Sequence, residues 1–406
     1  MANSAGADLR SLIVALVLAT LVQAFIAMAL FAPAVLAPAA QAGIGVAASF
    51  VGMFVSVAFV AAAFVASLGG GQVVRYGPVR VSQFCLLWTA AGTALFMTGV
   101  PLMIVCSALA IGLGYGPITP ASSAMLATRT PQRLRNVVMS IRQSGVPLGG
   151  ALAGALLPGL AVAFGWQIAA LSVVALCLIL VAVLQSMRER YDGERTDVRH
   201  PDHSSQLLLL RVVFRHAELR QVALTSFTYS GMQMCLSSFL IVFLTERAGM
   251  GYIEAGAVYS AAMTGGIVSR PLWGAAADYF RRARMVLGIL GVTMWLCACL
   301  LALVSPQWPY AAVIAVCMTF GVSAYGWNGI YIAEVARIAP GGNVALATGA
   351  AITLTFLGIV VMPVVFWLVV ALSNSYAAAF VLVGTVALAG GLLFFRKPQV
   401  QHPAIP

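Results

Sequence analysis

The sequence predicts an all-α membrane protein with twelve transmembrane helices, arranged as two pseudo-symmetric halves of six. Three observations support this prediction: the composition, the length of the apolar runs and an internal repeat. Of the 406 residues, 62% are hydrophobic and only 8% are charged, and the mean hydropathy is +0.99. A water-soluble domain needs far more polar residues to cover its surface. The chain is therefore expected to lie in a lipid bilayer.

The apolar runs have the length that a membrane-crossing helix requires, which is about 20 residues. The first run resembles a signal peptide but is longer than the apolar part of one, so it is expected to be retained. The segments 80–127 and 136–187 could also be divided differently. The expected spans are 11–36, 44–68, 80–99, 101–127, 136–163, 166–187, 221–244, 252–278, 285–304, 309–334, 344–372 and 376–395.

The second half of the chain echoes the first at a nearly constant offset. The matches are Gln23 with Gln233, residues 112–131 with 321–340, and Asn136 with Asn343, at shifts of 210, 209 and 207 residues. Such an echo indicates two copies of one unit, an organisation that places a transporter's substrate site between the copies. We expect a six-helix bundle over 1–187, a cytoplasmic linker over 188–215 and a second six-helix bundle over 216–406.

Basic residues predict the orientation. With the N-terminus inside, Arg247 is the only basic residue placed on the outer side, as the positive-inside rule requires. This predicts an inner-membrane protein with both termini in the cytoplasm, and it explains the net charge of +11 without a nucleic-acid partner. The inner side would hold Arg10, Arg75, Arg80, Arg129, Arg133, Arg135, Arg188, Arg190, Arg195, Arg199, Arg211, Arg215, Arg220, Arg281, Arg282, Arg284, Arg337, Arg396 and Lys397.

The sequence lacks the patterns of an enzyme or a metal site. The seven cysteines lie inside apolar runs without the spacing of metal ligands, and the four histidines lie in or beside the polar linker and in the C-terminal tail. No nucleophile elbow, phosphate-binding loop or metalloprotease pattern occurs. We expect no cofactor, no metal and no enzymatic activity, and a monomer whose surroundings are the lipid bilayer.

Two short loops resemble a signature of the major facilitator superfamily, roughly G-x-x-x-D-R-x-G-R-R, and with the twelve-span repeat the whole chain resembles that family. The first copy, GGQVVRYGPVR at 70–80, has Val74 where the family has Asp, and the second, GAAADYFRRAR at 274–284, keeps Asp278. The resemblance implies a cytoplasmic gate in which Asp278 ties the halves together near Asn136. The other gating candidates are Arg75, Arg80, Arg281 and Arg282. Alternatively, Asp278 only ends its helix.

Two further stretches bear on drug export. Proton-linked members of the family often carry an Arg four residues before a Gly pair in the fourth span, and Ala108 stands there instead. The stretch SGVPLGGALAGALLPG at 144–159 resembles a motif of drug antiporters, although small residues also serve close helix packing. Efflux of drugs or amphiphiles therefore stays open as an alternative. A membrane sensor or receptor that has lost transport is an alternative of another class.

Arg142 and Arg270 are the ionisable residues expected within the membrane, where charges are costly and usually functional. They would lie roughly 9 and 12 Å from the cytoplasmic edge at 1.5 Å per residue. Two buried guanidinium groups without a buried acid call for an anion. The segment SRPLWG at 269–274 also resembles the eighth span of monocarboxylate and oxalate porters, although Gly266 replaces the acid of lactate-type carriers. Alternatively, Arg142 pairs with Asp278 and Arg270 extends to the membrane surface.

The remaining candidates for the substrate cavity are polar and aromatic residues of spans one, four, seven and ten, the spans that line the centre in the superfamily. Gln23 and Gln233 are expected to face each other across the pseudo-two-fold axis. An aromatic wall with two arginines predicts a small organic anion with an apolar or aromatic part. These candidates are Gln23, Gln233, Tyr115, Thr119, Tyr229, Tyr325, Trp327, Asn328 and Tyr331.

Energy coupling is open between proton symport and anion exchange. Glu334 is the acid nearest the inner mouth, and its equivalent in the first half is Met125. We expect that the substrate carries the proton or that anions exchange, rather than that Glu334 takes the proton.

Overall fold

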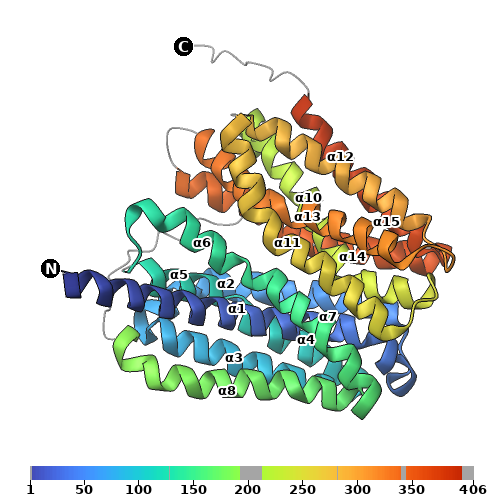
Figure 1. Ribbon diagram of the computed structural model, residues 1–406, viewed down its shortest axis with the longest axis horizontal. Helices are drawn as coiled ribbons and strands as arrows, with labels where there is room; N and C mark the ends of the chain where they lie inside the picture. The colour runs from blue at the N-terminus through green and yellow to red at the C-terminus, as the bar shows by residue number, and fades with distance from the viewer. Residues whose placement is uncertain (1, 128, 193–212, 281, 340–343, 396–406) are drawn as a thin grey trace.

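The computed structural model describes residues 2–127, 129–192, 213–280, 282–339 and 344–395, and it folds almost wholly as helices (Figure 1). The N-terminal half contains α1 (Ala2–Ile44), η1 (Ala48–Phe50), α2 (Val51–Tyr76), α3 (Pro78–Phe96), α4 (Pro101–Tyr115), α5 (Ile118–Ala127), η2 (Gln132–Leu134), α6 (Arg135–Gln143), α7 (Gly145–Phe164) and α8 (Trp166–Asp192). The C-terminal half contains α10 (Ala217–Glu246), α11 (Tyr252–Phe280), α12 (Ala283–Ala302), α13 (Tyr310–Arg337), α14 (Val344–Ser373), α15 (Tyr376–Leu392) and η4 (Leu393–Phe395).

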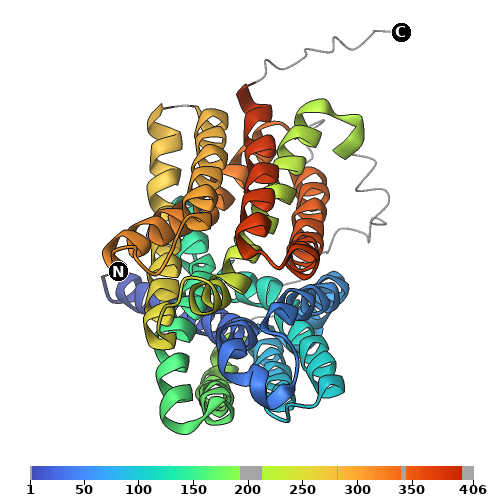
Figure 2. The ribbon, with the colours of Figure 1, turned by 90° about the vertical axis from the view of Figure 1, so that its right-hand side faces the viewer.

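These helices make the expected twelve spans, because α4 with α5 and α6 with α7 each form one span. Among the described residues, eleven segments are long and apolar enough to cross a bilayer, and α11, with 29 residues, supplies the twelfth. Figure 2 shows α1 to α8, from blue to green, in the lower part of the molecule and the later helices, from yellow to red, in the upper part. The fold is thus a multi-pass membrane bundle of two halves.

Helix α8 continues through Asp192, so the start of the expected linker over 188–215 is helical. Residues 193–212 of that linker lie outside the described residues.

Two spans are interrupted, and proline chemistry accounts for both breaks. Pro117 lies between α4 and α5, and Pro147 lies in the first turn of α7. Because proline has no N–H group, the carbonyl of Gln143 loses its usual donor four residues later, and the proline ring crowds the preceding turn. The amide of Ser144 instead donates to the carbonyl groups of Ser140 and Ile141. The helix is therefore interrupted at Ser144, directly after Arg142 and Gln143.

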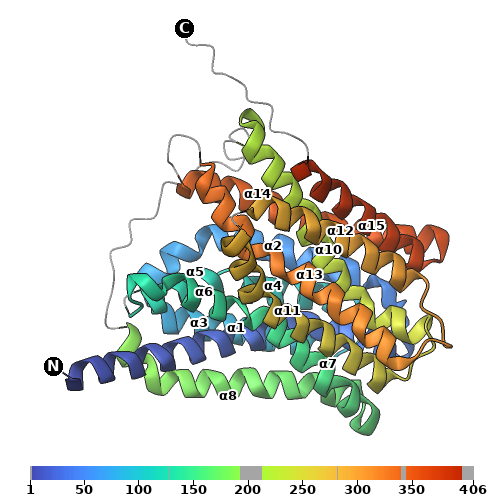
Figure 3. The ribbon, with the colours of Figure 1, turned by 45° about the horizontal axis from the view of Figure 1, so that its top comes forward.

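The two halves meet near the end of the bundle that lies opposite a cluster of arginines. We call the end where α2, α8, α11 and α13 finish the basic end, since it carries Arg75, Arg188, Arg282 and Arg337. Figure 3 shows α7 beside α11, and α2 lies against α14 in the same way. Three hydrogen bonds between the halves lie toward the opposite end. Ser56 of α2 donates to the carbonyl of Val360 in α14 at 2.7 Å. In α11, Ser260 donates to the carbonyl of Ala151 in α7 at 2.9 Å, and Tyr252 to that of Val35 in α1 at 2.8 Å.

Glycines allow this close approach of α7 and α11. A Cβ on Gly154 would lie 2.6 Å from the ring of Tyr259 and 2.8 Å from the carbonyl oxygen of Gly256. In the same helix, Gly145 packs against the backbone of Thr20 in α1. The small residues of the 144–159 stretch therefore let α7 pack closely against both halves. A larger side chain at Gly154 would push the halves apart at the end where they now meet.

The junction of α2 and α3, which follows Val74 in the last turn of α2, is held within its own half. Asp192, the last residue of α8, accepts hydrogen bonds from the amides of Val79 at 2.8 Å and Arg80 at 3.3 Å, and so caps the start of α3. Gly77 has φ of 88°, and any side chain there would meet Asp192. Burial raises the pKa of Asp192 above its usual range, although these two amides and Arg188 lower it.

Candidate functional site

Arg142 occupies the last turn of α6, beside the break in its span, and is 3% exposed. Its Nη1 donates to Ser122 Oγ at 3.0 Å and to Gln23 Oε1 at 3.5 Å. Its Nε is buried and has no hydrogen-bond partner. A buried N–H group without a protein partner is able to donate to a water molecule or to a ligand.

Arg270 approaches from the other half and is partly buried. It lies in α11, directly before Pro271, and its Nη1 donates to Gln143 Oε1 at 3.3 Å. Its Nε is also buried without a partner. Arg270 interacts electrostatically with Arg142, Tyr115 and Tyr325, which places the four side chains in one region. The expected pair of arginines therefore lies together at the interface between the halves.

The described residues offer no carboxylate to either arginine. Glu334 accepts hydrogen bonds from Arg284 Nε at 2.5 Å and from Arg337 Nη2 at 2.7 Å, and Glu218 accepts from Arg284 at 2.8 Å. These pairs hold α10, α12 and α13 together at the basic end. Glu246 accepts from the hydroxyl of Tyr376, and Glu254 from the amide of Gly251. The side chain of Asp278, the alternative partner of Arg142, lies outside the described part.

Tyr325 forms the aromatic wall beside Arg270. Its hydroxyl lies 2.5 Å from Ser237 Oγ, and the side chain is fully buried. Its ring fills the space over Gly266, because a Cβ there would lie 2.8 Å from Cγ of the tyrosine. The position at which lactate-type carriers place an acid is therefore covered by Tyr325.

Gln23 and Gln233 occupy equivalent positions but have different partners. Gln23 accepts from Arg142, whereas Gln233 Oε1 accepts from Trp327 Nε1 at 3.3 Å and from Asn328 Nδ2 at 3.4 Å. Each glutamine thus forms side-chain hydrogen bonds within its own half. Among the described residues, no hydrogen bond joins the two glutamines. Gln233 holds the polar side of α13 toward the interface.

Three other expected cavity residues have surroundings of their own. The buried hydroxyl of Tyr229 donates to the carbonyl of Leu287 at 2.6 Å, so it joins α10 to α12 inside the C-terminal half, with its ring against Trp327. The hydroxyl of Tyr331 lies 3.3 Å from Thr355 Oγ1. Thr119 is exposed in the first turn of α5. We therefore do not include Tyr229 in the arginine cluster.

The expected gating residues are only partly described. Arg75 lies over the ring of Tyr76 at 5.1 Å and Arg80 over the ring of Phe84 at 5.7 Å. Arg282 is exposed after α11. Arg281 and the side chain of Asp278 lie outside the described part.

Sequence reasoning missed three polar side chains of the cluster, namely Ser122, Gln143 and Ser237. Each is a small or neutral polar residue in an apolar run, and such residues serve equally well in helix packing. Gln143 did carry one signal, since it directly follows Arg142 in the chain.

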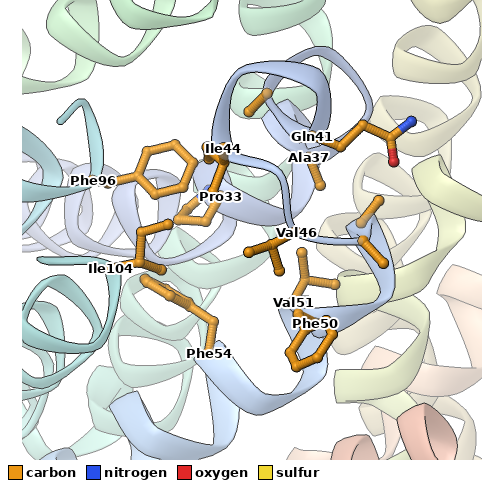
Figure 4. Close-up of a pocket in the computed structure, with 13 residues that line it drawn as sticks. Pro33, Ala37, Gln41, Ile44, Val46, Phe50, Val51, Phe54, Phe96 and Ile104 are labelled. Atoms are coloured by element: carbon orange, nitrogen blue, oxygen red, sulfur yellow. The ribbon is translucent and has the colours of Figure 1, made fainter. Parts of the chain in front are cut away.

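A separate cavity lies at the opposite end, inside the N-terminal half (Figure 4). It encloses about 410 Å³ of space, including its open mouth, between α1, η1, α2, α3 and α4. Its lining includes Phe54, Phe96 and Ile104, with Gln41 as the polar side chain at its rim. None of the expected site residues lines this cavity, so it is distinct from the arginine cluster.

The fold is that of a multi-pass membrane protein built from two helical halves, with the two arginines at the interface between them. A family model described as Major Facilitator Superfamily matches residues 18–363, and the chain belongs to this family. It is a transporter and not an enzyme.

Two curated relatives transport organic acids, by their names. The chain is 22% identical over 357 residues to a hexuronate transporter of Bacillus subtilis, covering 83% of each chain. It is 24% identical over 300 residues to a gentisate transporter of Corynebacterium glutamicum, covering 69% of this chain and 64% of the relative. A multidrug efflux pump, Tap, of Mycobacterium tuberculosis is 33% identical over 157 residues, which are 35% of this chain and 37% of the pump.

Solved structures confirm the fold. A peptide transporter POT in complex with sulfate has a TM-score of 0.70 at 15% identity and covers 94% of this chain and 93% of its own. A POT family transporter in complex with 5-aminolevulinic acid has a TM-score of 0.71 at 12% identity, with 94% and 95% covered. At these identities the likeness concerns the fold alone.

Proposed function

We propose that the protein is a secondary carrier that moves a small organic anion across the inner membrane by alternating access. The observation that carries this proposal is the pair of arginines, Arg142 buried and Arg270 partly buried, each with a buried Nε that has no hydrogen-bond partner. A charge within a membrane protein needs a counter-charge, and the described residues supply no carboxylate to Arg142 or Arg270. A carboxylate, sulfonate or phosphate would supply it.

In this proposal, different residues of the cluster contact the charged, polar and apolar parts of the substrate. Arg142 and Arg270 bind the charged group of the substrate. Polar contacts to the rest of the substrate come from Gln23, Gln233, Asn328 and Tyr331. Tyr115, Tyr325 and Trp327 form walls for an apolar or aromatic part, and Thr119 lies at the rim. The hexuronate and gentisate transporters bear the names of acids that carry hydroxyl groups, which supports the anionic class.

Orientation and gating complete the proposal. The basic end faces the cytoplasm, as the arginine distribution favours. The halves meet toward the opposite end, so this conformation is open toward the cytoplasm. Asp278, with Arg75, Arg80, Arg281 and Arg282, belongs to the gate that closes the basic end in the other conformation. We take the carrier to act as a monomer.

Anion exchange, or entry of the substrate with its own proton, accounts best for the energy coupling. Glu334 accepts three charge-assisted hydrogen bonds from Arg284 and Arg337, which stabilise its ionised form against a proton. The cluster itself has no described acid. An anion that leaves the site would therefore be replaced most readily by another anion.

Export of drugs is the second candidate, and the match to the efflux pump over 157 residues favours it. A cationic drug would have to bind beside two arginines, which repel it. The test measures uptake by reconstituted vesicles across radiolabelled monocarboxylates, dicarboxylates, aromatic acids and sulfonates, with a cationic dye as competitor. Saturable uptake of an acid that the dye does not inhibit is the expected result. Transport of the dye, with no acid transported, would contradict the proposal.

A further inference from the structure

The two arginines leave the same edge of their guanidinium groups free. In both residues Nη1 is engaged by a neighbouring side chain, and in both Nε is buried without a partner. The N–H of Nε and one N–H of Nη2 point to the same side of the planar group. They form a two-pronged donor that matches the two oxygens of a carboxylate. Each arginine therefore presents one complete binding fork.

The two forks are oriented independently. Arg142 is held by Gln23 of α1 and Ser122 of α5, whereas Arg270 is held by Gln143 at the end of α6. The arginines come from different halves of the molecule, on α6 and α11. One carboxylate has only two oxygens and can satisfy one fork fully. The other fork then lacks a bidentate acceptor, and a second carboxylate of the ligand would supply one.

The charges of the two arginines also indicate a ligand with two acidic groups. The two arginines bring two positive charges into one region, and they repel each other. A ligand with one negative charge leaves one of them without compensation at a depth where this is costly. A ligand with two negative charges compensates both.

We propose, on the basis of the anion-carrier function, that the substrate carries two separate acidic groups, one for the fork of Arg142 and one for the fork of Arg270. The substrate class is thus a dicarboxylate, or a carboxylate with a second acidic group. Its acidic groups bridge the two halves, and Tyr325 lies beside the part that joins them.

The experiment compares diacids with their own monomethyl esters, which keep the skeleton and remove one charge. Binding to the purified full-length protein is measured by calorimetry at neutral pH for malonate, succinate, glutarate, adipate and terephthalate, each against its monoester. We expect at least one diacid to bind tenfold or more tightly than its ester. We expect this ratio to fall to about one in Arg142→Gln and in Arg270→Gln, while the exposed control Arg220→Gln keeps it.

The outcomes separate this inference from the function on which it rests. Monoesters that bind and are transported as well as their diacids would overturn the two-group substrate and leave the anion carrier standing. So would a single divalent group, such as ethyl phosphate, that competes more strongly than any diacid. If no acid of either kind binds or is transported, the anion-carrier function itself fails. A thermal unfolding curve close to that of the parent shows that each variant is folded. The affinity of the same variant for the monoester provides a second measurement.

Discussion

Gln143 accepts a hydrogen bond from Arg270 at 3.3 Å, and this bond joins the two halves of the molecule beside the break in the fifth span. The contact makes Gln143 the neighbour of both arginines, since Arg142 precedes it in the chain. A neutral amide there orients Arg270 without neutralising it, so the positive charge stays available to a ligand.

Replacing Gln143 with Glu, an almost isosteric side chain, tests whether the charge of Arg270 is available to a ligand. The new carboxylate would be a resident counter-ion for Arg270, and we expect it to weaken binding of the transported anion about tenfold or more, since one tenfold step is ~1.4 kcal/mol. Calorimetric affinity is the measurement, and Gln167→Glu, at an exposed site in α8, is the control. An unchanged affinity in Gln143→Glu would show that Arg270 does not contact the ligand.

Replacing Arg270 with Lys keeps the charge and removes the fork. A lysine ammonium group is a point charge, so it cannot offer the paired N–H groups that a carboxylate accepts. We expect a loss of transport rate and affinity of about tenfold or more, on the order of the 1.5–3 kcal/mol of a charged hydrogen bond. Initial uptake rates over a range of substrate concentrations provide the measurement. Parental kinetics would remove Arg270 from the binding site.

Replacing Asp278 with Asn tests the gate at the basic end. If Asp278 ties the halves together when that end is closed, its loss shifts the population toward conformations open to the cytoplasm. Cysteines introduced on the cavity side of α11 and α14 would then react faster with a membrane-impermeant thiol reagent added from the basic end, in a background without the seven native cysteines. Unchanged labelling in a normally folded variant would leave Asp278 as a helix end in water.

Replacing Gly154 with Val tests closure at the opposite end, and the chain offers a matched control. A Cβ at Gly154 meets Tyr259 and Gly256, whereas a Cβ at Gly159, in the same helix, has nothing within 4 Å. We expect Gly154→Val to increase labelling of cavity cysteines from the periplasmic side and Gly159→Val to leave it unchanged. Equal labelling in the two variants would show that the α7 and α11 contact does not close the carrier.

Replacing Glu334 with Gln separates coupling from structure. The change weakens the pairs with Arg284 and Arg337, and we expect a loss of stability of about 1–3 kcal/mol, less than the ~3–5 kcal/mol for one partner of a fully buried pair. Exchange of labelled for unlabelled substrate at equal pH should persist, and so should uptake driven by a pH gradient where that occurs. If only the pH-driven uptake were abolished, Glu334 would be the coupling acid.

The sequence predicted the fold well because its signals are local and strong. Twelve apolar runs and the repeat of Gln23 at Gln233 need no knowledge of side-chain packing, and the family match agrees with them. Arg142 and Arg270 were found for the same reason, since a charge within an apolar run is rare. The breaks at Pro117 and Pro147 follow from the missing N–H of proline.

The pairings of individual side chains could not be predicted in this way. Gln23 and Gln233 share a place in the repeat, yet one contacts Arg142 and the other contacts α13. Tyr229 lies in a lining helix but turns its hydroxyl to Leu287, because a helix presents only part of its surface to the cavity. Asp192 caps α3 from a helix more than a hundred residues later, a contact that depends on tertiary packing.

The packing of Tyr325 over Gly266 limits the side chains that position 266 could acquire during evolution. A side-chain carboxyl at position 266 would collide with the tyrosine ring, so a single substitution there cannot install a protonatable acid. A smaller residue at position 325 must come first or at the same time, and that change removes the partner of Ser237 and a neighbour of Arg270. An acid at position 266, where lactate-type carriers have one, would therefore need a second substitution at position 325, beside Arg270.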